Sequence, residues 1–165
     1  VGIHGAYEGA LKYAGNPAMI SRAHFARYIV EQGHTKDTKT VFDHWLAKGK
    51  PGYVAHAWAT LEDSVAWIVG AGGTAVIAHP ARYRLTRAER RELFTALRDL
   101  GGRGIEVLSG AQGPEEAKEF ASVCREFGFL ASRGSDFHGP GESWMDLGKL
   151  PDLPEDLTPV WMQWN

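Results

Sequence analysis

Cysteine is almost absent from this sequence, because Cys124 is the only one among 165 residues. A disulfide framework and a thiolate zinc site are therefore both excluded. Cys124 stands in the segment FASVCREFGF, where apolar residues recur at helical spacing. This setting predicts a buried structural thiol rather than a catalytic nucleophile.

Long hydrophobic runs are also missing. No stretch approaches the ~18 apolar residues that a membrane-spanning helix needs. The opening VGIHGAYEGAL lacks the basic and apolar regions of a signal peptide. We therefore expect a cytoplasmic protein with no membrane partner.

Strong charge of one sign is missing as well. The net charge of −2 gives no general attraction to nucleic acid, so recognition of a DNA sequence is not expected. A substrate that carries phosphate would need a local positive site, built from metal ions or a few arginines.

What is present begins with a helical region, residues 1–57. The segments SRAHFARYIVEQG and KTVFDHWLAKG each place apolar side chains on one helical stripe and then reach a glycine. Glycine is the residue that most often follows the end of a helix. We therefore predict helices joined by short turns, forming a subdomain of their own.

Residues 58–150 alternate between helical and strand patterns. Thr60 and Thr86 each precede an acidic residue by three positions and open apolar helices, as in a capping box. Short apolar runs, TAVIAH, GIEVL and FLAS, lie between the helices. This alternation predicts an α/β fold with parallel strands. Three strands are too few to close a barrel, and we expect residues 151–165, rich in Pro and Trp, to wrap the outside.

Polar side chains stand where two of these strands end. His79 ends TAVIAH, and Asp136 and His138 follow FLAS in SDFH. Functional groups gather at the carboxyl ends of parallel strands, and carboxylate with imidazole suits Mn, Fe or Zn. His79 alone could be a core histidine, and Asp136 with His138 could be a turn beside a surface histidine. The occurrence of both clusters at successive strand ends favours a metal site.

These residues carry a resemblance to a known family. The segments AVIAHPARY, GGRGIEVLSG and ASRGSDFHGPGE are similar to the later motifs of the PHP (polymerase and histidinol phosphatase) superfamily. NPAMISRAHFARYIVEQG and VFDHWLAKGKPGYV resemble a helical insertion of its nucleotide-directed branch. That branch contains 3′,5′-nucleoside bisphosphate phosphatases and a 5′-to-3′ exoribonuclease.

The resemblance implies that the chain is the C-terminal part of a distorted (β/α)7 barrel with a helical insertion. The family barrel holds up to three divalent metal ions, usually Mn, with Fe or Zn as alternatives. His79, Asp136 and His138 fall on ligands of this metal site. The other family ligands belong to an N-terminal half that nothing here matches, so we expect residues 1–165 alone to be inactive.

The implied activity is metal-dependent hydrolysis of 5′-phosphorylated nucleotides or short RNA, by attack of a metal-bound hydroxide. Arg22, His24 and Arg82 are the residues that would hold a terminal phosphate; solvated surface charge is the alternative. A phosphatase for 3′,5′-nucleoside bisphosphates or another small phosphate ester is a second hypothesis. A non-catalytic PHP-like structural module is a third. Glu106, on an apolar strand, could orient a metal ligand without itself binding the metal.

Overall fold

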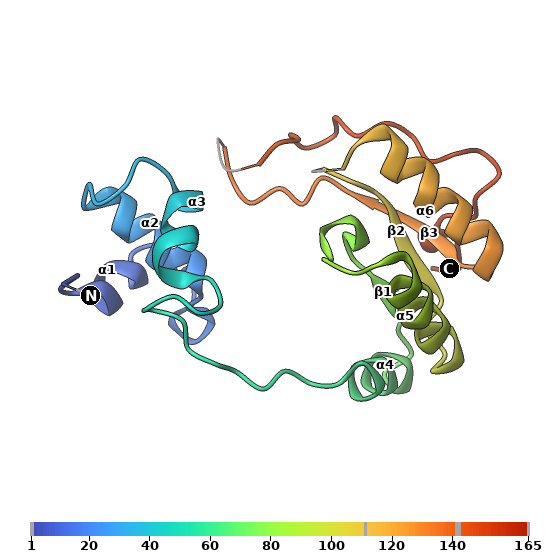
Figure 1. Cartoon of the computed structure of the whole chain (residues 1–165), viewed down its shortest axis with the longest axis horizontal. Helices are drawn as coiled ribbons and strands as arrows, with labels where there is room; N and C mark the ends of the chain where they lie inside the picture. The colour runs from blue at the N-terminus through green and yellow to red at the C-terminus, as the bar shows by residue number, and fades with distance from the viewer. Residues whose placement is uncertain (1, 111, 141–142, 165) are drawn as a thin grey trace. The chain divides into compact units, whose positions relative to one another are not determined.

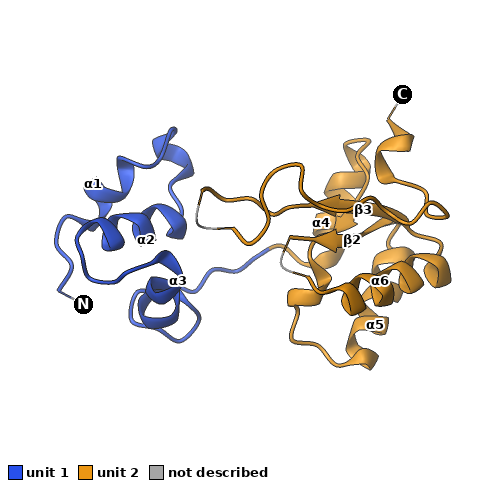
Figure 2. Cartoon of the chain, turned by 90° about the horizontal axis from the view of Figure 1, so that it is seen from above, with its two compact units in different colours: residues 1–58 blue, residues 59–165 orange. Residues whose placement is uncertain are grey.

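The computed structural model describes residues 2–110, 112–140 and 143–164. The chain forms two compact units, residues 1–58 and 59–165 (Figure 2). The division lies one residue beyond the expected end of the helical region, and the C-terminal tail is part of the second unit. None of the helices in the described ranges is long and apolar enough to cross a membrane.

The first unit is helical, as the sequence predicts. Its elements are α1 (Ala6–Leu11), η1 (Pro17–Met19), α2 (Arg22–Glu31), α3 (Thr38–Val41) and η2 (Phe42–Leu46) (Figure 1). A small apolar core joins α2 to the two segments that follow, through the buried side chains of Ala26, Ile29, Val41 and Leu46. Helix α1 packs closely on α2, since a Cβ added at Gly9 would lie 2.2 Å from the ring of Tyr28.

The second predicted helix of this unit is shorter than the sequence pattern suggests. Only Thr38–Val41 is α-helical, and Phe42–Leu46 forms a wider π-helical turn. The Ala47 amide donates to the Phe42 carbonyl at 2.9 Å, an i to i+5 bond that widens the turn. Such π-helical turns are rare, and Leu46 is the buried residue of this one.

The second unit is an α/β layer with three parallel strands. Strands β1 (Val76–Ile77), β2 (Gly104–Ser109) and β3 (Leu130–Gly134) lie in the order β1-β2-β3. Helices α4 (Leu61–Gly70), α5 (Arg87–Asp99) and α6 (Pro114–Phe127) precede the respective strands, as Figure 1 shows. The parallel α/β architecture is confirmed, while the described residues form an open sheet rather than a closed barrel.

Local sequence explains where these helices begin. The Thr60 hydroxyl accepts a hydrogen bond from the Asp63 amide at 3.0 Å, and the Thr86 hydroxyl accepts one from the Glu89 amide at 3.3 Å. Each bond satisfies a donor that the first helical turn leaves without a partner. The predicted starts of α4 and α5 are therefore confirmed.

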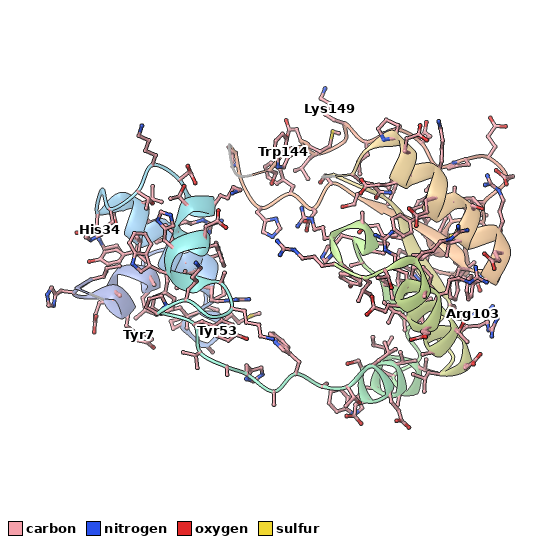
Figure 3. The ribbon with its side chains drawn as sticks, viewed as in Figure 1. Tyr7, His34, Tyr53, Arg103, Trp144 and Lys149 are labelled. Carbon is pink, nitrogen blue, oxygen red and sulfur yellow. The ribbon has the colours of Figure 1, made fainter. Side chains whose placement is uncertain are left out.

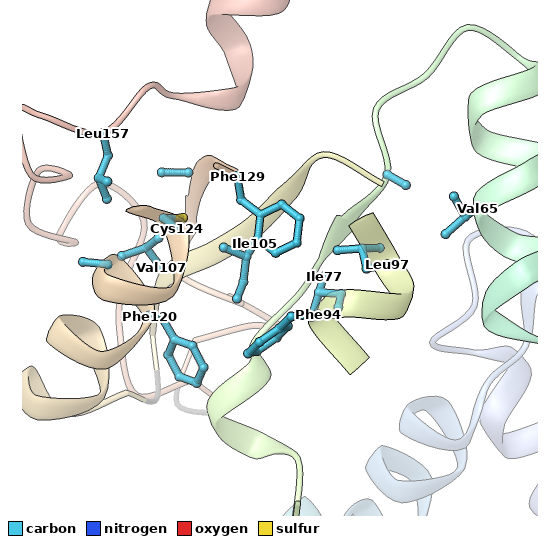
Figure 4. Packing of buried hydrophobic residues seen from close by; sticks show 13 residues of the cluster. Val65, Ile77, Phe94, Leu97, Ile105, Val107, Phe120, Cys124, Phe129 and Leu157 are labelled. Atoms are coloured by element: carbon cyan, nitrogen blue, oxygen red, sulfur yellow. The ribbon is translucent and has the colours of Figure 1, made fainter. Parts of the chain in front are cut away.

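The core of the second unit lies mainly between the sheet and helices α5 and α6, and it includes Val65 of α4 (Figure 4). Phe94 of α5 is 1% exposed and makes edge-to-face contacts with Phe120, Phe127 and Phe129. Cys124 of α6 is 1% exposed, which confirms the predicted buried thiol. Burial raises the pKa of this thiol to about 12.

The C-terminal tail is fixed to the edge of the sheet. Pro159 bridges to Ala131 in the parallel sense, and the Ala131 amide donates to the Thr158 carbonyl at 2.8 Å. Leu157 is buried in the core, and Arg125 of α6 binds Asp156 at 2.6 Å. The tail therefore covers the open side of β3 before η4 (Val160–Gln163).

Candidate metal and phosphate site

The carboxyl ends of the three strands meet at one edge of the sheet because the strands are parallel. His79 follows β1 by two residues, and Asp136 follows β3 by two residues. Both adopt the left-handed backbone conformation, with φ of 33° and 53°. Such conformations are uncommon for residues other than glycine, and they often occur at functional sites.

Glu106 of β2 lies between these two strand ends. Its side chain is almost buried, with 9% of the residue exposed. One carboxylate oxygen, Oε2, accepts a hydrogen bond from the His79 amide at 2.5 Å. The other oxygen, Oε1, faces Gly134 at the end of β3, where an added Cβ would lie only 2.8 Å away. Glu106 thus lies beside the residues that follow β1 and end β3.

Arg82 extends toward Asp136 from the short η3 turn (Pro80–Arg82) that follows His79. Its Nη1 lies 2.7 Å from Asp136 Oδ2. The two groups attract as charges, but their angle does not meet the geometry of a hydrogen bond, since Oδ2 is buried without such a bond. The candidate phosphate ligand and the candidate metal ligand are therefore ion-paired in this structure.

His138 lies on the same loop as Asp136 and is more exposed. Its Nδ1 is 2.7 Å from the Asp136 carbonyl oxygen, and its amide donates to Ser143 Oγ at 2.7 Å. A ring that donates from Nδ1 to a backbone carbonyl carries its lone pair on Nε2. This tautomer is suited to binding a metal through Nε2.

The charges of the site act on one another. Burial raises the pKa of the Glu106 carboxyl above its ordinary value, while the hydrogen bond from the His79 amide and the charge of Arg82 lower it. The negative charge of Asp136 raises it further. Burial and the nearby Glu106 also raise the pKa of Tyr83, whose ring meets that of His79 edge-to-face at 6.0 Å.

The candidate ligand atoms are of the types that bind divalent cations. Within the described part of the chain, His79 Nδ1 and Asp136 Oδ2 are buried without a hydrogen bond. An imidazole nitrogen and a carboxylate oxygen in this state are natural ligands for Mn, Fe or Zn. No group of three or more His, Cys, Asp or Glu among the described residues is arranged to hold an ion by itself.

Arg22 and His24 belong to the first unit and have structural partners there. Arg22 donates from Nη1 to the Leu46 carbonyl at 3.3 Å and lies over the ring of Phe42. His24 Nδ1 accepts from the Ser21 amide at 3.1 Å, which completes a capping box at the start of α2. Both residues thus stabilise the entrance of this helix.

Arg22 also lines a cavity of about 960 Å³ within the first unit. The lining is mostly apolar and includes the aromatic residues Trp45, Tyr53 and Trp58, together with the basic residue Lys48. Tyr53, labelled in Figure 3, lies where the first unit leads into the segment toward α4. Aromatic faces beside positive charge are suited to a nucleobase that carries phosphate.

The sequence pattern predicts His79, Asp136, His138 and Arg82 as site residues, but it does not indicate the ion pair between Arg82 and Asp136 or the close approach of Glu106 to Gly134. The pair joins residues far apart in the chain, and only the parallel topology brings them together. A signal for the second contact does exist, because GIEVL places one charged residue on an otherwise apolar strand. Glu106 on this strand and Gly134 at the end of the next strand were therefore the sequence signals for their close approach.

Comparison with known proteins identifies relatives of nearly the whole chain. The chain is 50% identical over 162 residues to a 3′,5′-nucleoside bisphosphate phosphatase from Chromobacterium violaceum. The match covers 98% of this chain and 57% of that protein. The chain is 41% identical over 163 residues to the 5′-3′ exoribonuclease Rnm of Salmonella typhimurium, covering 99% of this chain and 55% of that protein. No family model matches. The chain spans about half the length of these curated relatives.

Solved structures agree with the sequence comparison. An amidohydrolase from Chromobacterium violaceum, with bound sulfate and no metal, superposes with a TM-score of 0.89 at 49% identity over 98% of this chain and 56% of that one. A protein from Bifidobacterium adolescentis, assigned as a metal-dependent phosphoesterase, superposes with a TM-score of 0.70 at 25% identity. That match covers 93% of this chain and 52% of the other.

Proposed function

We propose that this chain, a member of the PHP superfamily in the branch of the phosphatase and exoribonucleases just described, forms part of a metal-dependent phosphoesterase acting on nucleotides or short RNA. The observation that carries this proposal is the meeting of His79, Glu106, Arg82 and Asp136 at one sheet edge. Buried polar atoms normally have hydrogen-bond partners, whereas His79 Nδ1 and Asp136 Oδ2 at this edge have none among the described residues, which supports a ligand-binding role over a purely structural one.

His79, Asp136 and His138 are the residues that would hold metal in this chain. Manganese is the expected ion, with iron or zinc as alternatives and up to three ions in the whole protein. When bound, these ions would activate water and neutralise charge on the phosphoryl group. Arg82 balances the charge of Asp136 in this structure, and a bound cation would take over that role. The guanidinium could then turn to a phosphate oxygen, to which it can donate two parallel hydrogen bonds.

Arg22 and His24 are proposed as contacts for a terminal phosphate of the substrate. Support comes from their position at the start of α2, where free backbone N–H groups attract anions. The cavity beside Arg22 offers aromatic surface for a base. Because His24 Nδ1 accepts the capping bond, its Nε2 carries a proton that could be donated to phosphate.

Two substrate classes are compatible with this site, and the relatives include both. One is 5′-phosphorylated RNA, from which mononucleotides would be released. The other is a 3′,5′-nucleoside bisphosphate, which would release inorganic phosphate; the 50% identity to such a phosphatase favours this second class. The test is to supply the full-length natural protein with each substrate and Mn²⁺, and to measure both products. Release of neither product in the presence of metal would contradict the proposal and leave a non-catalytic module.

Replacing Arg22 with alanine is expected to weaken binding of 5′-phosphorylated substrates more than binding of 5′-hydroxyl substrates. A hydrogen bond to a charged group contributes roughly 1.5–3 kcal/mol, or about 10-fold or more in KM. Measuring KM for both substrates with Arg22→Ala and with the conservative variant Arg22→Lys checks this. An equal loss for both substrates would show that Arg22 serves only Leu46 and Phe42, and therefore the fold.

A further inference from the structure

We propose that Glu106 is a positioning residue that fixes the imidazole of His79 for metal binding, and that Gly134 is required because it leaves room for the Glu106 carboxylate. This inference rests on the proposed metal site. It assigns a role to two residues, on β2 and β3, which are not themselves metal ligands in the proposal.

The conformation of His79 is what needs to be held. Its backbone is left-handed, with φ of 33° and ψ of 55°, and it directly precedes Pro80. A residue before proline prefers an extended backbone, so Pro80 disfavours the left-handed geometry of His79. The His79 amide donates to Glu106 Oε2 at 2.5 Å. A charged acceptor at this distance makes one of the stronger hydrogen bonds available.

The burial of Glu106 fixes the position of the oxygen that accepts the hydrogen bond from the His79 amide. The carboxylate is nearly buried and lies on the central strand, which is paired with a neighbour on each side. A side chain packed in this way has few alternative rotamers, so its oxygen defines where the His79 amide must lie. The orientation of the amide in turn determines the direction in which the His79 side chain leaves the backbone.

Gly134 lies against the second oxygen of the Glu106 carboxylate. A Cβ at this position would lie 2.8 Å from Glu106 Oε1, closer than atoms in proteins tolerate. The backbone of Gly134 is not left-handed, so alanine is compatible with its conformation. A substitution there would therefore act through displacement of Glu106. This makes Gly134→Ala an independent way to disturb the same contact.

The experiment compares four variants: Glu106→Ala, Glu106→Gln, Gly134→Ala and the double variant Glu106→Ala/Gly134→Ala. In the full-length natural protein, Zn²⁺ affinity is measured by competition with a chromophoric chelator, and exchange of the His79 amide proton is followed by NMR. Loss of a group that orients a metal ligand typically lowers affinity 10–100-fold. We expect about that loss for Glu106→Ala and Gly134→Ala, together with faster exchange of the His79 amide.

Two features of the result distinguish positioning from general destabilisation. Glu106→Gln retains an oxygen acceptor and should stay close to the unaltered protein in both measurements. The double variant should be no worse than Glu106→Ala alone, because Gly134→Ala has nothing to displace once the carboxylate is gone. Gly113→Ala is the matched control, since its Cβ would lie at an ordinary 3.7 Å from Glu116 Oε2.

Unchanged affinity in Glu106→Ala, with His79→Ala lowering it, would overturn the positioning role and leave the metal site intact. Additive losses in the double variant would also overturn it. If His79→Ala leaves Zn²⁺ affinity unchanged, or if the unaltered chain binds no Zn²⁺, the proposed metal site is wrong or incomplete in this chain. The exchange of the His79 amide in the four variants then decides whether Glu106 holds that backbone.

Discussion

Residues 1–165 on their own are expected to show no metal-dependent hydrolysis of a 5′-phosphorylated oligonucleotide, even in excess Mn²⁺. A hydrolytic centre of this kind holds two or more ions at fixed spacing. The chain offers His79, Asp136 and His138, and its described residues form no complete set of ligands. Ions held by so few groups bind weakly and keep most of their water.

The comparison is with the full-length natural protein that carries these residues, assayed under the same conditions. There, His79→Ala should lower the rate by more than the ~10–100-fold typical of a residue that only supports a ligand. His34→Ala is the control, because this exposed histidine lies three residues beyond the end of α2 in the first unit (Figure 3). Turnover by residues 1–165 near the full-length rate, abolished by His79→Ala, would show that this chain contains a complete site.

Replacing Phe94 with alanine is expected to destabilise the second unit by about 3–5 kcal/mol. Phe94 is 1% exposed, and its ring meets three others edge-to-face, at centroid distances of 5.9–6.5 Å. The substitution would leave a cavity between α5, α6 and the sheet and would remove these ring contacts, each of which contributes about 0.5–1.5 kcal/mol beyond burial.

The measurement should follow the second unit by itself, because two units need not unfold together. Native-state hydrogen exchange of the β2 amides reports its opening free energy. Trp144→Ala is the control, since this ring is 91% exposed and should change stability by no more than about 0.5 kcal/mol. A change of less than about 1 kcal/mol in Phe94→Ala would mean that the core repacks around the missing ring.

Local chemistry made much of the fold predictable. The threonine caps of α4 and α5 are short-range features, and so is the glycine that follows α2, so the sequence near each position is enough to indicate them. The alternation of helices and strands also predicts the parallel order, because parallel strands require crossover connections. These predictions rest on contacts between residues that are close in the chain.

The features that were not predictable depend on distant residues or on unusual backbone. Strand β1 is only two residues long, and two residues after it His79 adopts a left-handed conformation that no residue type there indicates. The pairing of Arg82 with Asp136 arises only when two strand ends meet. The π-helical turn at Phe42–Leu46 replaces an α-helix whose apolar pattern is similar. Periodicity alone cannot separate such cases.

The burial of the only cysteine has a practical consequence. A thiol reacts with alkylating reagents as the thiolate, and Cys124 lies in the core with its pKa raised to about 12. Reagent can reach the thiol only when the core around it opens. The rate of alkylation therefore reports how often the second unit opens, without any added label.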